Sequence, residues 1–163
     1  ALNKDETGRR VTEPIAGPLF TGEPGSEAEA SGTIYICRSK SENEFVSQNR
    51  EIVHKIGVTS TSVEKRISGA ENDPTFLLAD VSLVATYDLY GIDRNKLEKL
   101  IHRFFASARL NIEIKDRFGR PVIPQEWFCV PFECIEEVVE RIKDKSITQY
   151  KYDVKSASLV KFK

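Results

Sequence analysis

The alternation of apolar and polar side chains predicts strands along the middle of the chain. The stretch from Thr33 to Arg38 places Tyr35 on the opposite face from its isoleucine neighbours, because successive strand side chains alternate between the two faces of a sheet. Val53 to Thr59 is expected as a second strand, in which Lys55 faces away from His54 and the apolar residues. A third strand lies within Leu77 to Leu89, and its partly apolar faces predict a central position in the sheet.

Helices are predicted where the apolar spacing changes to three or four residues. Thr61 and Glu64 have the spacing of a capping box, so a helix is expected from about Ser62 to Gly69. Asp93 is a good N-cap for a longer helix. The apolar stripe of that helix consists of Leu97, Leu100, Ile101, Phe104 and Phe105. A last helix is expected over Phe132 to Lys143.

Further strands are expected towards the end of the chain. Ile112 to Lys115 and Glu126 to Val130 are predicted as two strands joined by a turn that contains glycine and proline. Ser146 to Val154 and Ser158 to Phe162 are expected to form a closing hairpin. The long polar segment from Ser39 to Glu51 is expected as a loop. Together these elements predict an α+β fold with a small, mostly antiparallel central sheet flanked by helices.

Composition narrows the class of protein. No apolar run approaches the ~20 residues of a membrane span, and no signal peptide is visible, so a membrane partner is not expected. The three cysteines, Cys37, Cys129 and Cys134, lack a Cys-x-x-Cys spacing and predict reduced thiols in a cytoplasmic protein. Residues 1–31 are rich in Gly, Pro, Glu and Ala and predict a linker or an extended N-terminal arm, which leaves 32–163 as the folded domain.

The charge is balanced overall but unevenly distributed. The net charge of −1 argues against a strongly electrostatic nucleic-acid binder. Residues 93–120, however, hold eight basic and four acidic side chains, a net charge of +4. That segment is either a local basic surface or the solvated face of a helix, and the sequence leaves both open.

Two cations are expected to meet next to the second predicted strand. Lys55 is followed by Gly57, and Arg66 lies about one turn inside the helix that comes next. Lysine is depleted in strands, and a glycine permits close approach of a ligand to the backbone. A lysine and an arginine brought together in this way suit a phosphate group. The alternatives are an exposed strand lysine and an ordinary surface arginine.

The order of these residues resembles the GIY-YIG nuclease superfamily. The first motif of that superfamily is nearly intact at Thr33-Ile34-Tyr35, and Lys55 stands where a second tyrosine is usual. Some restriction-type members carry a lysine there. The segment from Leu97 to His102 resembles the later helix of the superfamily, and Glu126-Trp127-Phe128 resembles a strand motif of the lysine-bearing branch.

The resemblance covers roughly residues 32–143 and implies a metal-dependent DNA endonuclease. Tyr35 would then be the base that activates a water molecule, with Lys55 stabilising its phenolate form. Arg66 would clamp the scissile phosphate. Glu98 would bind one Mg²⁺ or Mn²⁺, with water filling most of the other coordination positions.

Two further residues are candidates for the same site. His102 follows Glu98 by one helical turn and would orient it, assist a proton transfer or contact phosphate; a half-buried structural histidine is the alternative. Glu126 is a second carboxylate, while the motifs do not show which residue corresponds to the late asparagine of the superfamily. The expected substrate is DNA, or else RNA, with an upstream domain or a partner protein supplying affinity because the net charge is low. The rival function is a catalytically inactive nucleic-acid-binding or protein-interaction module on the same fold.

Overall fold

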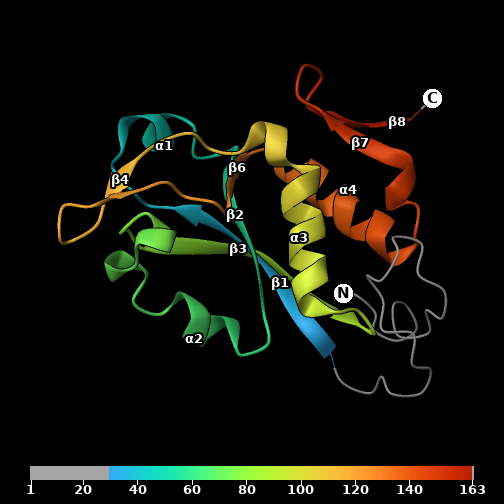
Figure 1. Ribbon diagram of the computed structural model, residues 1–163, viewed down its shortest axis with the longest axis horizontal. Coiled ribbons are helices and arrows are strands. Elements are labelled where there is room, and N and C mark those ends of the chain that lie inside the picture. Colours follow the sequence, from blue (N-terminus) through green and yellow to red (C-terminus); the bar gives the residue numbers. More distant parts are fainter. Residues whose placement is uncertain (1–29, 163) are drawn as a thin grey trace.

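A four-stranded antiparallel sheet organises the computed structural model, which describes residues 30–162 (Figure 1). The strand order is β3-β1-β2-β6. These strands are β1 (Ala30–Ser39), β2 (Val53–Thr59), β3 (Val81–Tyr90) and β6 (Trp127–Cys129). Two separate hairpins pair β4 (Ile114–Lys115) with β5 (Pro121–Val122), and β7 (Tyr150–Asp153) with β8 (Ser158–Lys161). The α+β class with a small antiparallel sheet is therefore confirmed.

Four helices accompany the strands: α1 (Glu44–Gln48), α2 (Val63–Ile67), α3 (Arg94–Phe104) and α4 (Phe132–Lys143). Short 3₁₀ turns connect them, at Ala70–Asn72, Pro74–Phe76, Ala106–Ala108 and Ile147–Gln149. None of the helices in the described part of the chain has the length and apolar character of a membrane span. The predicted linker or arm, residues 1–31, lies outside the described residues except for Ala30 and Ser31, which belong to β1.

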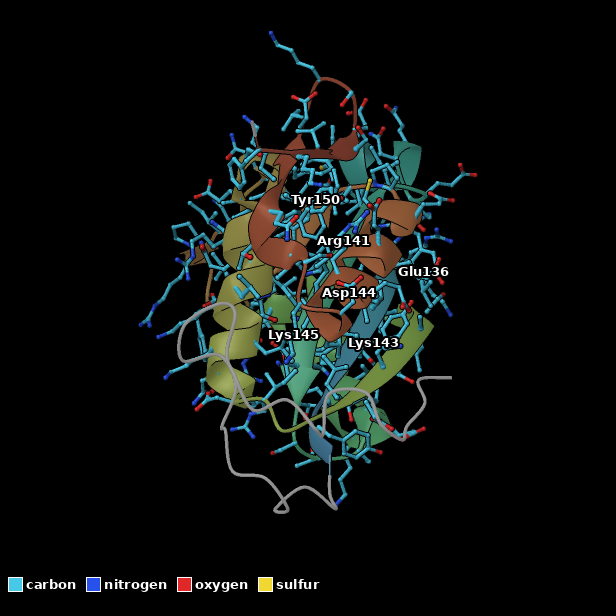
Figure 2. All side chains as sticks on the ribbon, turned by 90° about the vertical axis from the view of Figure 1, so that its right-hand side faces the viewer. Glu136, Arg141, Lys143, Asp144, Lys145 and Tyr150 are labelled. Atoms are coloured by element: carbon cyan, nitrogen blue, oxygen red, sulfur yellow. The ribbon has the colours of Figure 1, made fainter. Side chains whose placement is uncertain are left out.

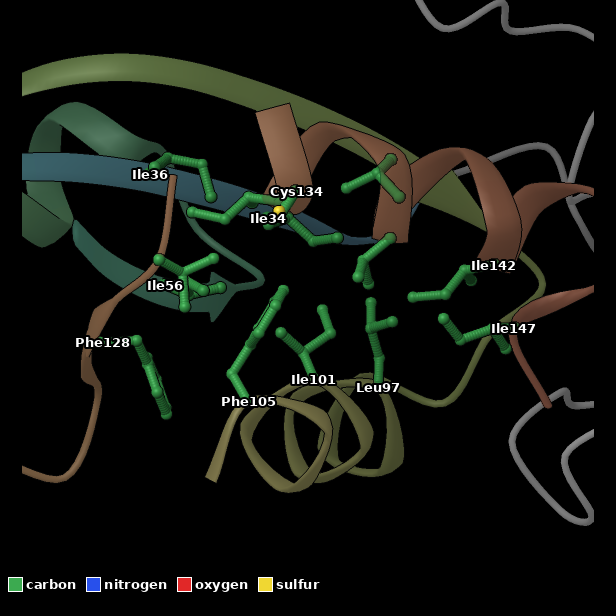
Figure 3. Packing of buried hydrophobic residues seen from close by; sticks show 14 of the residues in the cluster. Ile34, Ile36, Ile56, Leu97, Ile101, Phe105, Phe128, Cys134, Ile142 and Ile147 are labelled. Atoms are coloured by element: carbon green, nitrogen blue, oxygen red, sulfur yellow. The ribbon is translucent and has the colours of Figure 1, made fainter. Parts of the chain in front are cut away.

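The larger core lies between one face of the sheet and helices α3 and α4. Ile34, Ile36 and Ile56 point from β1 and β2 into this core, where Leu97 and Ile101 of α3 meet them (Figure 3). Helix α4 adds its own apolar stripe, which consists of Cys134, Ile135, Val138, Val139 and Ile142. The apolar residues that recur at helical spacing in α3 and α4 therefore form one continuous buried layer against the sheet.

The C-terminal hairpin is joined to α4 by a cation–aromatic contact. The guanidinium carbon of Arg141 lies 3.9 Å from the centre of the Tyr150 ring, and the two side chains meet where α4 and β7 adjoin (Figure 2). Arg141 also donates from Nε to Glu137, at 3.2 Å, and from Nη1 to Ser146, at 3.2 Å. These contacts fix the turn through which the chain leaves α4 and enters the hairpin.

The opposite face of the sheet carries a second, smaller core. Tyr35 and Cys37 of β1 lie there with Phe76 and Trp127, all of them buried. Cross-strand register explains the separation, because Tyr35 pairs with Gly57 while Ile34 pairs with Val58, and directly opposite residues of an antiparallel pair share a face. The two central strands are therefore buried on both faces.

Helix starts agree with the sequence except for one shift of register. Asp93 caps α3 as predicted, because its Oδ1 accepts a hydrogen bond from the backbone N–H of Lys96 at 3.0 Å. At α2 the expected capping box of Thr61 and Glu64 is wrong, since Ser62 is the N-cap and accepts from Lys65 N–H at 3.1 Å. Thr61 and Ser62 are adjacent and both carry a hydroxyl group, so the sequence alone did not decide which of them caps the helix.

Three predictions about strands and loops are corrected by the structure. β3 is an edge strand and not a central one. Its residues Val84, Ala85 and Tyr87 are only partly buried against the α3 and α4 core, and Leu83 is exposed. The segment 39–51 is not a plain loop, because α1 forms within it, capped by Asn43. β4 pairs with β5 across a short turn, whereas β6 joins β2 in the central sheet.

Candidate active site

Tyr35 lies in the smaller core, and a glycine on the neighbouring strand makes room for it. Its side chain is 1% exposed, and its cross-strand partner is Gly57. A Cβ atom placed on Gly57 would lie 2.5 Å from the Tyr35 hydroxyl oxygen, so the ring lies directly over the backbone of β2. The glycine next to Lys55 therefore admits an aromatic ring from within the protein.

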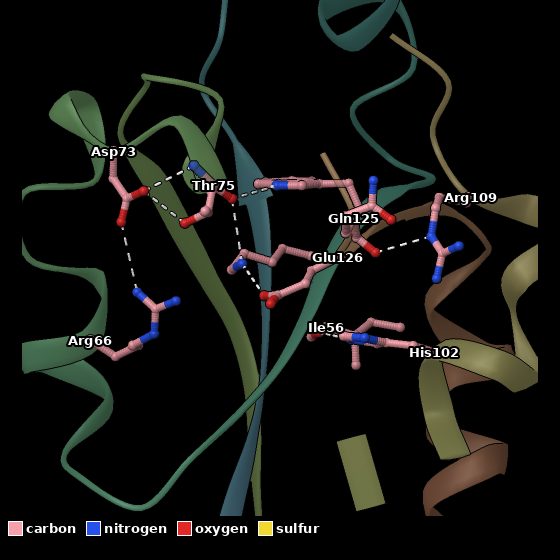
Figure 4. Close-up of polar contacts among 10 residues, drawn as sticks. Ile56, Arg66, Asp73, Thr75, His102, Arg109, Gln125 and Glu126 are labelled. Atoms are coloured by element: carbon pink, nitrogen blue, oxygen red, sulfur yellow. Dashed lines mark hydrogen bonds and ion pairs between the residues drawn. The ribbon is translucent and has the colours of Figure 1, made fainter. Parts of the chain in front are cut away.

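Lys55 is completely buried, so the alternative of an exposed strand lysine is wrong. Its ammonium group forms an ion pair with the carboxylate of Glu126 and donates to the Thr75 carbonyl at 3.4 Å (Figure 4). It also lies 4.5 Å from the centre of the Phe76 ring. Burial lowers the pKa of Lys55, and the neighbouring Glu126 carboxylate opposes that shift. Lys55 and Glu126 thus depend on each other, because a lone charge in this position would be costly.

Arg66 approaches the same aromatic ring from α2. Its guanidinium carbon lies 5.0 Å from the centre of the Phe76 ring. Its Nη1 lies 3.8 Å from the Asp73 carboxylate (Figure 4). The Arg66 side chain keeps 35% of its surface exposed, in contrast to Lys55. The predicted meeting of two cations therefore takes place around Phe76, and Arg66 is the cation that solvent reaches.

The charges around Tyr35 show which candidates come together. Burial raises the pKa of the Tyr35 phenol well above its usual value, Arg66 opposes the rise, and the carboxylates of Glu126 and Glu98 add to it. Lys55 was expected to stabilise the phenolate; in the structure its ammonium group is paired with the carboxylate of Glu126. Arg66 is therefore the cation that acts on the pKa of Tyr35.

His102 and Glu98 reach the site region from α3. The Nε2–H of His102 donates to the Ile56 carbonyl at 2.8 Å (Figure 4), and its ring centre lies 5.3 Å from that of Phe128. This hydrogen bond holds α3 against β2 and requires the proton on Nε2, because a carbonyl oxygen only accepts. Glu98 lies one turn earlier and is half-buried. It is close enough to influence the pKa of Tyr35.

A segment that the sequence analysis did not single out completes the site. Asp73 Oδ1 accepts from the backbone N–H of Thr75 at 2.9 Å and from its hydroxyl at 2.7 Å. The Thr75 carbonyl then accepts from the indole Nε1–H of Trp127 at 3.0 Å as well as from Lys55. The Asp-Pro-Thr sequence, an N-cap followed by a proline, was the available signal for this turn. Its role in anchoring Lys55 depends on contacts that sequence spacing does not show.

The described residues contain no group of three or more His, Cys, Asp or Glu side chains that could hold a metal ion. A single carboxylate nevertheless fits a hard cation that keeps most of its water, as Mg²⁺ usually does. Glu98 is the half-exposed carboxylate with this character on α3. The arrangement therefore offers a guanidinium for an anion, a phenol for proton transfer and a carboxylate for a cation.

Comparison with known proteins assigns the family. Residues 32–143 match the T5orf172 domain, and the chain therefore belongs to the T5orf172 domain family. This family is associated with nuclease function. It is distinct from the GIY-YIG superfamily, so the assignment suggested by the sequence motifs is wrong, although the matched span coincides with the span of the resemblance. Lys55 was already the residue at which this chain departed from the GIY-YIG motifs, which usually have a tyrosine there.

One relative and one negative result complete the comparison. The uncharacterized protein YeeC of Bacillus subtilis (strain 168) is 36% identical to this chain over 135 residues. The match covers 83% of this chain and 35% of that protein, so the chain spans about a third of the relative's length. No solved structure matches the chain.

Proposed function

We propose that this domain is a metal-dependent nuclease that hydrolyses phosphodiester bonds in DNA. The observation that carries the proposal is that Tyr35 and Arg66 both lie by the smaller core, with the carboxylates of Glu126 and Glu98 near enough to act on the pKa of Tyr35. Hydrolysis of a phosphodiester needs an activated water, neutralised phosphate charge and a stabilised leaving oxygen. Membership of a nuclease-associated family supports the same class of reaction.

Arg66 is proposed to bind the scissile phosphate. Within the described part of the chain Arg66 is paired with the Asp73 carboxylate, and the distance of 3.8 Å makes this a loose ion pair. A phosphate can replace this contact with two parallel N–H donors from the guanidinium fork. Because 35% of the Arg66 side chain is exposed, a ligand reaches it without unfolding of α2.

Tyr35 is proposed to accept the proton of the attacking water. A buried phenol with a raised pKa is a poor base at neutral pH. The phenolate fraction increases as the pH rises, so the cleavage rate is expected to increase through the alkaline range. Arg66 limits the rise in the pKa of Tyr35, and its removal should therefore shift the rate profile to higher pH.

Glu98 is proposed to hold Mg²⁺ or Mn²⁺, which would stabilise negative charge on the phosphate. Glu126 is paired through Oε1 with Lys55, so it is proposed to act through that pair and not as the ligand. Lys55 is accordingly a positioning residue, which keeps the Glu126 carboxylate and the Phe76 ring in place. His102 is proposed to position α3 through its bond to Ile56.

The test is cleavage of supercoiled plasmid across pH, with Mg²⁺, Mn²⁺ or excess chelator, together with DNA binding and thermal melting for each variant. Tyr35→Phe should reduce the rate by roughly 10²–10⁴-fold, the usual contribution of a positioned acid or base, while binding persists. Tyr87→Phe is the matched control, because Tyr87 lies on β3 and packs against the other core. Glu98→Ala should abolish cleavage, whereas Glu136→Ala on the exposed side of α4 should not.

Four results would overturn parts of the proposal. Full activity in excess chelator would remove the metal. A Tyr35→Phe variant that cuts as fast as wild type would transfer the role of base, with His102 the next group to test. A wild-type protein that binds DNA without cutting it under any metal or pH would establish the inactive binding module, and preferential cutting of RNA strands would replace DNA as the substrate.

A further inference from the structure

The hairpin formed by β4 and β5 presents an exposed aromatic ring between two arginines. Phe118 is 71% exposed, the highest fraction among the large apolar side chains in the described part of the chain. The guanidinium carbons of Arg117 and Arg120 lie 5.2 and 5.8 Å from the centre of its ring. We propose that this hairpin is a nucleic-acid contact in which Phe118 stacks on an unpaired base and the two arginines contact the adjacent phosphates.

The turn that carries Phe118 is held in shape by its own hydrogen bonds. Asp116 Oδ1 accepts from the backbone N–H groups of Phe118 and Arg120, both at 2.9 Å. The Asp116 N–H donates to the Arg120 carbonyl, and the Gly119 N–H donates to the Asp116 carbonyl, each at 2.9 Å. Gly119 has φ +80°, a conformation that other residues adopt rarely. The backbone is therefore preorganised, and binding would need to order little more than side chains.

The charge of the hairpin distinguishes nucleic acid from other partners. Residues 114–122 contain three basic side chains and one acidic side chain, a net charge of +2, whereas the whole chain has −1. The one acidic group, Asp116, is engaged inside the turn. A flat ring flanked by arginines matches a base flanked by phosphates, because bases stack on aromatic rings and phosphates accept from guanidinium groups. An apolar protein surface would leave both arginines without anionic partners.

The hairpin is connected to the proposed active site by its base. Ile112 and Ile114 pack against the smaller core, which contains Tyr35. Arg109 Nε donates to the Gln125 carbonyl at 3.0 Å, one residue before Glu126. Figure 1 shows the hairpin projecting from the end of the molecule opposite to the β7–β8 hairpin. A strand whose base stacks on Phe118 would therefore continue towards the side of the sheet that carries Tyr35.

This inference rests on the proposed function and deepens it by naming the substrate. The proposed substrate is DNA that contains unpaired bases next to the cleaved strand, such as a single strand, a gap or a frayed end. A fully paired duplex hides its base faces in the stack and would contact the arginines alone. The proposal therefore predicts a preference for unpaired DNA that depends on the ring of Phe118.

The experiment is a binding titration in chelator, so that cleavage does not interfere, with two DNA probes of equal length. One is a single strand with 2-aminopurine in the middle, and the other is the fully paired duplex. Phe118→Ala should weaken single-strand binding by roughly 5- to 100-fold, the range for loss of one stacked base, and should change duplex binding much less. Phe118→Trp should retain single-strand binding and quench 2-aminopurine. Ile123→Ala is the matched control, because Ile123 is also exposed (56%) and follows the hairpin directly.

The arginines provide a second, independent readout. Arg117→Ala and Arg120→Ala should weaken binding to both probes and should each reduce the salt dependence by roughly one phosphate contact. Unchanged single-strand binding by Phe118→Ala would overturn the proposal, and so would an equal loss on both probes, which would indicate backbone contact only. If wild type binds DNA but never cuts it, the nuclease proposal fails while this test stands. If wild type binds neither probe, both fail.

Discussion

The buried imidazole of His54 makes the acid stability of this domain a quantitative prediction. His54 faces away from Lys55, is 0% exposed and packs near Phe132. Its Nδ1–H donates to the Val130 carbonyl at 2.9 Å, and its Nε2 accepts from Arg38 Nε at 3.1 Å. Burial lowers the pKa of His54 from 6.5 to about 4, and the Arg38 guanidinium adds to the effect. Both nitrogens are thus committed to the neutral ring.

The sign and size of the effect follow from that pKa. The folded protein keeps His54 neutral, whereas the unfolded chain takes up a proton below pH 6.5. The stabilisation is therefore fully present above pH 6.5 and is lost as the pH falls towards about 4. At about 1.36 kcal/mol per pKa unit, the difference corresponds to roughly 3 kcal/mol in the free energy of unfolding. This is a large part of the stability of a typical domain.

The assay is urea unfolding at several pH values between 7 and 4.5 for wild type and His54→Leu. The leucine variant will be less stable at pH 7, because Arg38 and Val130 lose their partner. Its stability should nevertheless fall less steeply with acid, by roughly 2 kcal/mol between pH 7 and 5. Carboxylates that titrate in this range affect both proteins equally. Parallel curves for the two proteins would refute the assignment of acid sensitivity to His54.

Three other substitutions test the packing of the site. Gly57→Ala should cost about 1–3 kcal/mol of stability in urea unfolding, because its Cβ would collide with the ring of Tyr35. The control Gly32→Ala should cost less, because its Cβ would come no closer than 3.1 Å to neighbouring side chains. Equal losses for the two variants would contradict the close approach of Tyr35 to Gly57. Glu126→Ala should cost about 3 kcal/mol of stability at pH 7, because it leaves Lys55 buried without its carboxylate partner. The loss of stability should shrink at alkaline pH, where Lys55 becomes neutral. A loss that does not depend on pH would argue against a charged lysine. Wild type should lose stability above pH 10, where the unfolded chain ionises and the Tyr35 phenol, whose pKa is raised, stays neutral; Tyr35→Phe should lose less in unfolding curves between pH 9 and 11.

Elements with strong local signals were predictable from the sequence, and their arrangement was not. Helices α3 and α4 follow from apolar residues at helical spacing, and Asp93 marks the start of α3. The strand β3 was predicted as an element but misplaced to the centre, because sheet order depends on pairing between distant segments. The turn at Asp116 decided that β4 pairs with β5.

At the site, the residue types were also predictable from the sequence, whereas their contact partners were not. Tyr35, Arg66 and Glu98 were selected for their chemistry, and the structure brings their charges into one neighbourhood. The ion pair between Lys55 and Glu126 joins residues 71 positions apart, so no local sequence pattern could predict it. The sequence assigned Lys55 to the phenolate because a lysine and a tyrosine on adjacent strands were expected to meet. In the structure Lys55 is buried and forms its ion pair with Glu126.

The indole of Trp127 provides an optical probe at the proposed site. It is the single tryptophan of the chain and is completely buried. Its Nε1–H is bonded to the same Thr75 carbonyl that accepts from Lys55. Fluorescence excited at the tryptophan band therefore comes from one known position, and its emission maximum responds to the Asp73–Phe76 turn. Ligand binding at Arg66 that moves this turn is thus observable in the unlabelled protein, by stopped-flow mixing, before any phosphodiester bond is cut.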